Sequence, residues 1–177
     1  MKRNTFFRTL IEIIVILGFI TIGVTAITYV IQPDAIIDKT FISLIIIAVG
    51  ACGLLAYLSL TSLGKLKNIP SVVAALLNVA LGIVLLLLNI DLSLTCIIWG
   101  IASIGIQAVK ITNSVFGITE KTLTNGIKII VCLVEIAFCV ILIIRKKPAI
   151  NGHVIYMGIA LFIEAFLSFI SLIMHRE

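Results

Sequence analysis

Two glutamates near the middle of long apolar runs are the residues best placed to do chemistry. Glu135 precedes Pro148 by nearly four helical turns, and Glu164 follows it by a little over four. At about 1.5 Å of rise per residue, this spacing predicts similar depths in an antiparallel helical hairpin. A carboxylate at mid-membrane depth is costly and is a functional-site candidate by default. Because desolvation and like charge both favour the neutral acid, we expect at least one of the two to be protonated at neutral pH.

Two amides repeat this spacing around an earlier turn. Asn78 precedes Asp91 by the same interval that separates Glu135 from Pro148, and Gln107 follows Asp91 as Glu164 follows Pro148. The turns at Asp34, Asp91 and Pro148 are themselves equally spaced along the chain, which is typical of internal duplication.

The functional hypothesis is a proton- or cation-responsive site formed by Glu135 and Glu164 and flanked by Asn78 and Gln107. The alternative is structural, with a protonated carboxyl pair that joins two helices as the amide pair does.

The elements that must position these residues are membrane helices. The chain has 177 residues, of which 62% are hydrophobic and 12% charged, and its mean hydropathy is +1.32. Such a composition excludes an ordinary soluble domain. We therefore predict an all-α integral membrane protein, a single domain over 1–177, with hairpins at about 9–60, 71–110 and 126–174. The apolar runs that predict its six transmembrane helices are 9–31, 40–60, 71–90, 92–109, 126–144 and 153–174.

Basic residues predict the orientation of these helices. Six spans place both termini on one side, and cytoplasmic termini put nine Lys and Arg residues inside against four outside. The inside set is Lys2, Arg3, Arg8, Lys65, Lys67, Lys110, Lys121, Lys128 and Arg176. The outside set is Lys39, Arg145, Lys146 and Lys147. The triplet 145–147 departs from the rule, and we interpret it as an anionic-lipid anchor at the interface or an outward anionic contact.

The first apolar run allows two interpretations. A basic start, an apolar run and small residues up to Ala26 also fit a secretory signal cleaved after that residue. We favour a retained helix, because the run is long for a signal core and has a partner helix further on.

Catalytic and metal-binding patterns are missing from the sequence. The four cysteines all fall in apolar runs, which predicts small buried side chains. His153 and His175 are placed at helix ends, and no histidine is predicted to be buried. No combination of His, Cys and carboxylate has metal-site spacing, and no hydrolase, protease or phosphate-loop motif is present. We predict no enzyme activity, catalytic residue, cofactor or metal. We also predict no nucleic-acid partner, because the net charge of +5 lies in short loops and at the N-terminus, as is usual for cytoplasmic membrane loops.

The layout of three hairpins resembles the HdeD-like family of small acid-resistance membrane proteins. The residues that carry the resemblance are LGIVLLLLNIDLSLTCIIWGIASIGI at 81–106 and LVEIAFCVILIIRKKPAINGHVIYMGIALFIEAFLSFIS at 133–171. Acidic residues in the fifth and sixth helices, here Glu135 and Glu164, are also similar to that family. The chain departs from the usual Asn-Pro turn with Gln32-Pro33, Asn89-Ile90-Asp91 and Lys147-Pro148.

The resemblance implies a bacterial or archaeal plasma-membrane protein linked to acid or general stress, with no catalytic residues. Its expected partner is the lipid bilayer, with a homo-oligomer or a membrane protein as further alternatives. Two other functions stay open. One is a small proton-coupled transporter or channel subunit that uses the glutamates, and the other is an interaction protein in which they are structural.

Overall fold

The described part of the chain is almost entirely helical. The computed structural model describes residues 2–32, 36–61, 69–116 and 122–174. These residues form six long helices and no strand: α1 (Lys2–Ile31), α2 (Lys39–Thr61), α3 (Ile69–Leu87), α4 (Leu92–Phe116), α5 (Thr122–Arg145) and α6 (Ile150–Met174). A short 3-10 helix, η1 (Lys147–Ala149), joins α5 to α6. The predicted fold class, all-α with six spans, is confirmed.

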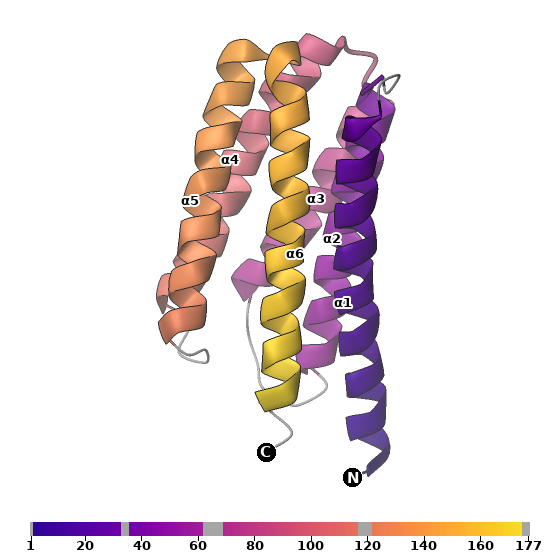
Figure 1. The fold of residues 1–177 in the computed structure, drawn as a ribbon, viewed down its shortest axis with the longest axis vertical. Helices are drawn as coiled ribbons and strands as arrows, with labels where there is room; N and C mark the ends of the chain where they lie inside the picture. Colours follow the sequence, from indigo (N-terminus) through magenta and orange to yellow (C-terminus); the bar gives the residue numbers. More distant parts are fainter. Residues whose placement is uncertain (1, 33–35, 62–68, 117–121, 175–177) are drawn as a thin grey trace.

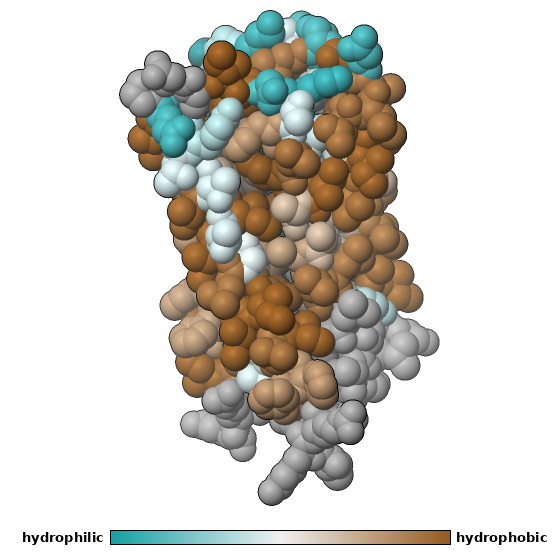
Figure 2. All heavy atoms as spheres, turned by 90° about the vertical axis from the view of Figure 1, so that its right-hand side faces the viewer, coloured by the Kyte–Doolittle hydropathy of each residue, from teal (hydrophilic) through white to brown (hydrophobic). Residues whose placement is uncertain are grey.

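Each of the six helices is long and apolar enough to cross a membrane. The spanning segments have 19 to 24 residues, and a hydrocarbon core of about 30 Å needs about 20. They are Thr9–Ile31, Lys39–Tyr57, Ile69–Leu87, Leu92–Thr112, Leu123–Arg145 and Lys147–Ile170. Figure 2 shows a broad apolar belt below a polar rim at one end of the bundle. The chain is therefore a multi-pass membrane protein.

The helices form a closed ring in chain order, and α6 returns to pack against α1 (Figure 1). The closest pairs are α2 with α3, α4 with α5, and α6 with α1. The pairs within the predicted hairpins are packed less closely. Figure 1 also shows that α1 begins and α6 ends at the same end of the bundle, as an even number of spans requires. The helices α1, α3 and α5 all end at the opposite end of the bundle, which we call the turn end.

Glycines set the close approach of the tightest pairs. A Cβ atom on Gly82 would lie 2.8 Å from the Ser43 carbonyl oxygen, and one on Gly100 would lie 3.1 Å from that of Cys139. Moving Ser43 and Gly82 forward along the chain by the interval between successive turns gives Gly100 and Cys139, the residues of the second contact. The two contacts are therefore related by the sequence period. Small residues favour helix association in lipid because they allow backbones to approach.

The third tight pair involves α1. A Cβ atom on Gly158 would lie 3.1 Å from the Gly23 carbonyl oxygen. Close packing at this point makes α1 an integral part of the bundle.

Aspartates begin two of the helices at the turn end. The Phe41 amide donates to Asp38 Oδ1 over 2.8 Å at the start of α2. The amides of Ser93 and Leu94 donate to the Asp91 carboxylate, each over 3.2 Å, at the start of α4. Such side chains satisfy backbone donors that have no partner within the helix. The Leu94 amide, more than any other group, lowers the pKa of Asp91, because it stabilises the charged carboxylate.

Lys146, between α5 and η1, has a backbone conformation that suits glycine. Its φ of 54° and ψ of −124° belong to a region that L-residues rarely adopt. We expect Lys146→Gly to raise the free energy of unfolding by about 1 kcal/mol, because the strain is removed. Lys147→Gly is the matched control, since it removes the same charge without a positive φ. Thermal unfolding in detergent measures both variants, and equal shifts would show that charge, and not backbone strain, is responsible.

One predicted boundary is wrong. The fourth apolar run is predicted to end near Val109, with Lys110 in a long connection, but α4 continues to Phe116 and its apolar span reaches Thr112. Lys110 therefore belongs to a membrane span and not to an inside loop. A helix tolerates such a lysine because its long apolar stem packs while the amine reaches a polar partner. The shortened connection, 117–121, lies outside the described residues.

Candidate functional site

The first polar pair in the bundle joins α4 to α6. Lys110 Nζ lies 3.2 Å from Glu164 Oε1 and donates a hydrogen bond to it. About a third of each side chain is exposed on the isolated chain. Because α4 and α6 are not among the close neighbours in the ring, the long lysine side chain makes the link between them. The sequence did not predict this pair, since its apolar runs place Lys110 in a loop.

The second polar pair joins α5 to α6. His153 Nε2 lies 3.7 Å from Glu135 Oε1, and the side chains are only 1% and 7% exposed. The Trp99 ring of α4 packs edge-on against the His153 ring, with centroids 4.4 Å apart. The prediction that no histidine is buried is wrong. His153 is indeed close to the start of α6, but the first turn of this helix already lies inside the bundle.

Polar atoms in this second pair lack partners. Glu135 Oε2, His153 Nδ1 and His153 Nε2 are buried and make no hydrogen bond to any described residue. Leaving a buried donor or acceptor unpaired costs about 1–3 kcal/mol, and more for a charged group. Such orphaned atoms in a native core call for a physical explanation.

Cys139 completes a cluster with this pair. It lies one helical turn after Glu135 on the same face of α5, and one ligand-type atom from each of Glu135, Cys139 and His153 lies within 4.8 Å of the other two. The sequence shows no metal-site spacing among these residue types, but the fold brings these three side chains together. The i,i+4 spacing of the acid and the thiol was visible in the sequence. The histidine was not, because it comes from another helix.

The two glutamates have different nearest partners. Glu135 contacts His153, which precedes Glu164 on α6 by three helical turns, about 16 Å of rise. The Lys110 charge acts on both acids, more strongly on Glu164. The predicted pair is thus two separate contacts, Glu135 with His153 and Glu164 with Lys110, connected electrostatically through one lysine.

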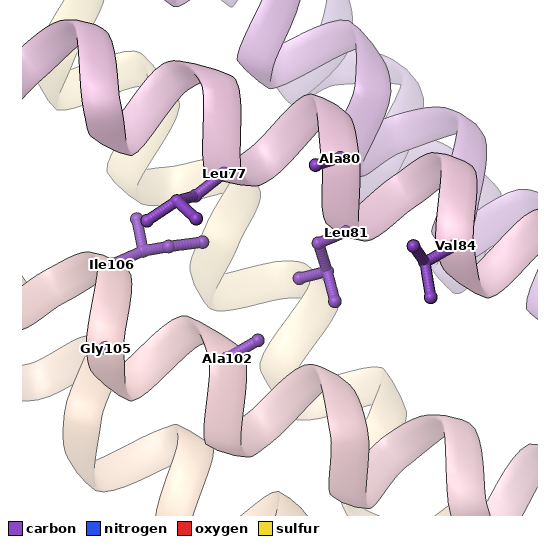
Figure 3. Close-up of a pocket in the computed structure, with 7 residues that line it drawn as sticks. All are labelled: Leu77, Ala80, Leu81, Val84, Ala102, Gly105 and Ile106. Atoms are coloured by element: carbon purple, nitrogen blue, oxygen red, sulfur yellow. The ribbon is translucent and has the colours of Figure 1, made fainter.

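The two amides do not take part in either contact. Asn78 and Gln107 are half-buried on α3 and α4, and no hydrogen bond between described residues joins either amide to a glutamate. Beside them, a groove of about 380 Å³ separates α3 from α4 (Figure 3). Its lining is wholly apolar: Leu77, Ala80, Leu81, Val84, Ala102, Gly105 and Ile106. This lining suits a lipid chain and offers no polar group to orient a hydrophilic solute.

The basic triplet lies at the turn end. Arg145 is the last residue of α5, and Arg145, Lys146 and Lys147 are all exposed. Lys147 is close enough to Asp91, in the neighbouring turn, to act on it electrostatically. The triplet is thus available to lipid headgroups, with one acid beside it. The cysteines are free thiols, and Cys96, Cys132 and Cys139 are buried, as predicted from their apolar surroundings, whereas Cys52 is only partly buried.

Comparison of the chain with protein-family models, with curated proteins and with solved structures finds no match.

Proposed function

We propose that the chain is a non-enzymatic plasma-membrane protein of the HdeD-like type, linked to acid or general stress, and that the Lys110–Glu164 ion pair is its proton-responsive element. The observation that carries the proposal is this ion pair, formed within two apolar spans at an Nζ–Oε1 distance of 3.2 Å. The link to stress rests on the resemblance of the sequence, at 81–106 and 133–171, to the HdeD-like family.

Protonation of Glu164 changes the balance of charge between α4 and α6. Charged residues within membrane spans are costly and pair with one another, so each member of this pair stabilises the other. The charged groups acting on Glu164 are Lys110 of α4 and, from α5, Lys128, while Glu135 lies further along α5. When Glu164 is neutral, Lys110 keeps a charge without its nearest partner. The ion pair that links α4 to α6 then weakens, so acid loosens the contact between these two helices within the membrane.

The basic residues support cytoplasmic termini. Lys110 and Lys128 both lie within spans, and leaving them out gives seven Lys and Arg residues on the inside against four at or beyond the outer ends of the spans. The exposed triplet 145–147 then lies at the outer surface, where lipid phosphates are available to it as anionic partners in addition to Asp91.

Survival of cells after an acid challenge tests the proposal. A strain without the protein is rescued with the wild type, with Glu164→Gln, or with Glu12→Gln as a control glutamate on α1, at equal membrane levels. We expect the wild type and the control to restore survival and Glu164→Gln to fail, because an amide cannot change its charge. Full rescue by Glu164→Gln would exclude the ion pair as the responsive element. No benefit from the wild type would overturn the link to acid.

A proton-coupled transporter or channel subunit is the second candidate function. It is favoured by one observation: two polar pairs, Glu135–His153 and Lys110–Glu164, follow one another at different heights between α4, α5 and α6. Substrate-dependent proton flux in vesicles containing the purified protein would support this candidate. Copurification of a stoichiometric membrane protein, without flux, would favour the interaction protein.

A further inference from the structure

We propose that Glu135, Cys139 and His153 form a binding site for a divalent transition cation of the Zn²⁺ type. The site goes beyond the proposed function, because none of its three ligands is Lys110 or Glu164.

The geometry is close to that of a bound ion. The three ligand-type atoms lie within 4.8 Å of one another, and the Glu135 and His153 atoms are 3.7 Å apart. With bonds of about 2.0–2.3 Å, neighbouring ligands of a tetrahedral zinc ion are about 3.3–3.7 Å apart. Binding would require a side-chain rotation that moves the Cys139 thiol closer, since the three atoms lie up to 4.8 Å apart and Cys139 shares a face of α5 with Glu135.

The donor atoms match a borderline cation. One carboxylate oxygen, one thiolate and one imidazole nitrogen are the three ligand types that zinc takes in proteins. Three protein ligands also leave a fourth position open, which is the pattern of zinc sites that hold a water or an exchangeable ligand. Hard cations such as Mg²⁺ and Ca²⁺ do not fit, because they prefer all-oxygen surroundings.

The orphaned atoms are the independent sign of a ligand. Glu135 Oε2 and both ring nitrogens of His153 are buried without a hydrogen-bond partner among the described residues. A cation would satisfy the carboxylate and one ring nitrogen at once. It would also remove the cost of holding a carboxylate between apolar helices.

The surroundings hold these ligands in place. The Trp99 ring packs edge-on against His153, and the hydroxyl of Ser103 interacts with the Cys139 thiol. Close approach of α4 at Gly100 to the Cys139 backbone leaves little freedom at this point of α5. Neighbours that hold the ligands in a fixed orientation raise the affinity of a site for its metal.

Loading the purified full-length protein in detergent with Co²⁺, followed by gel filtration, tests the site. We expect one Co²⁺ per chain, with d–d bands of tetrahedral geometry and a thiolate-to-cobalt charge-transfer band in the near ultraviolet. Cys139→Ser should lose the charge-transfer band and bind at least tenfold more weakly. Cys96→Ser, a buried cysteine outside the cluster, should keep both the band and the stoichiometry.

A measurement on the wild-type protein alone also tests the site, so the test does not depend on the stability of any variant. X-ray absorption of the Zn²⁺-loaded wild type should show one sulfur at about 2.3 Å and nitrogen or oxygen neighbours at about 2.0–2.1 Å. No stoichiometric uptake, or zinc without a sulfur neighbour, would overturn the site. An unchanged charge-transfer band in Cys139→Ser would do the same.

Discussion

We expect Lys110→Met to lower the free energy of unfolding by about 2–3 kcal/mol, because it leaves the Glu164 carboxylate without its nearest cation. Removing one partner of a buried ion pair costs about 3–5 kcal/mol. We expect a smaller loss here because about a third of each side chain is exposed. Methionine has nearly the length of lysine, so the packing of the stem is kept and the charge alone is lost.

The double variant Lys110→Met/Glu164→Met separates the loss of a contact from the cost of an orphaned charge. Replacing both members of such a pair with apolar residues is often neutral or stabilising, so we expect the double variant to recover most of the stability. Denaturation of Lys110→Met, Glu164→Met and the double variant in mixed micelles, followed by the fluorescence of the single tryptophan, gives the double-mutant cycle. Losses that simply add in the double variant would mean that the pair contributes no interaction of its own.

Gly82→Ala is expected to have the second-largest effect, a loss of about 1–3 kcal/mol in the free energy of unfolding. The added Cβ would lie 2.8 Å from the Ser43 carbonyl oxygen and 3.0 Å from the Ile47 amide nitrogen. Both neighbours are backbone atoms, so α2 and α3 must move apart to admit one methyl group. Overpacking of this kind typically costs about 1–3 kcal/mol.

Gly105→Ala is the matched control for this variant. Gly105 lies on α4, and a Cβ atom there would meet no atom within 4 Å. Alanine favours the helix over glycine by roughly 0.5–1 kcal/mol, so we expect no loss and a small gain. If Gly82→Ala and Gly105→Ala shift the thermal midpoint equally, close approach at Gly82 is not what holds α2 and α3 together.

The sequence alone determined that this protein has six apolar helices, that its turns fall near Asp34, Asp91 and Pro148, and that both termini lie on one side. These features are local, because a run of about 20 apolar residues must form a helix in lipid, where every backbone polar group needs an internal partner. The mid-span acids could also be singled out, since a carboxylate costs free energy in any membrane helix. The resemblance to the HdeD-like family stays a prediction.

Only the tertiary structure decided which residues meet. The sequence suggested that Glu135 and Glu164 face each other, but the ring gives one of them His153 and the other Lys110. Partners on different helices depend on the rotation and height of each helix. In lipid these are set by small residues such as Gly82 and Gly100 at the closest contacts. Because lipid tails are as apolar as the helix faces, hydrophobicity carries no signal of which face turns inward. For that reason the buried histidine, the bridging lysine and the cluster with Cys139 appeared only once the six helices were packed.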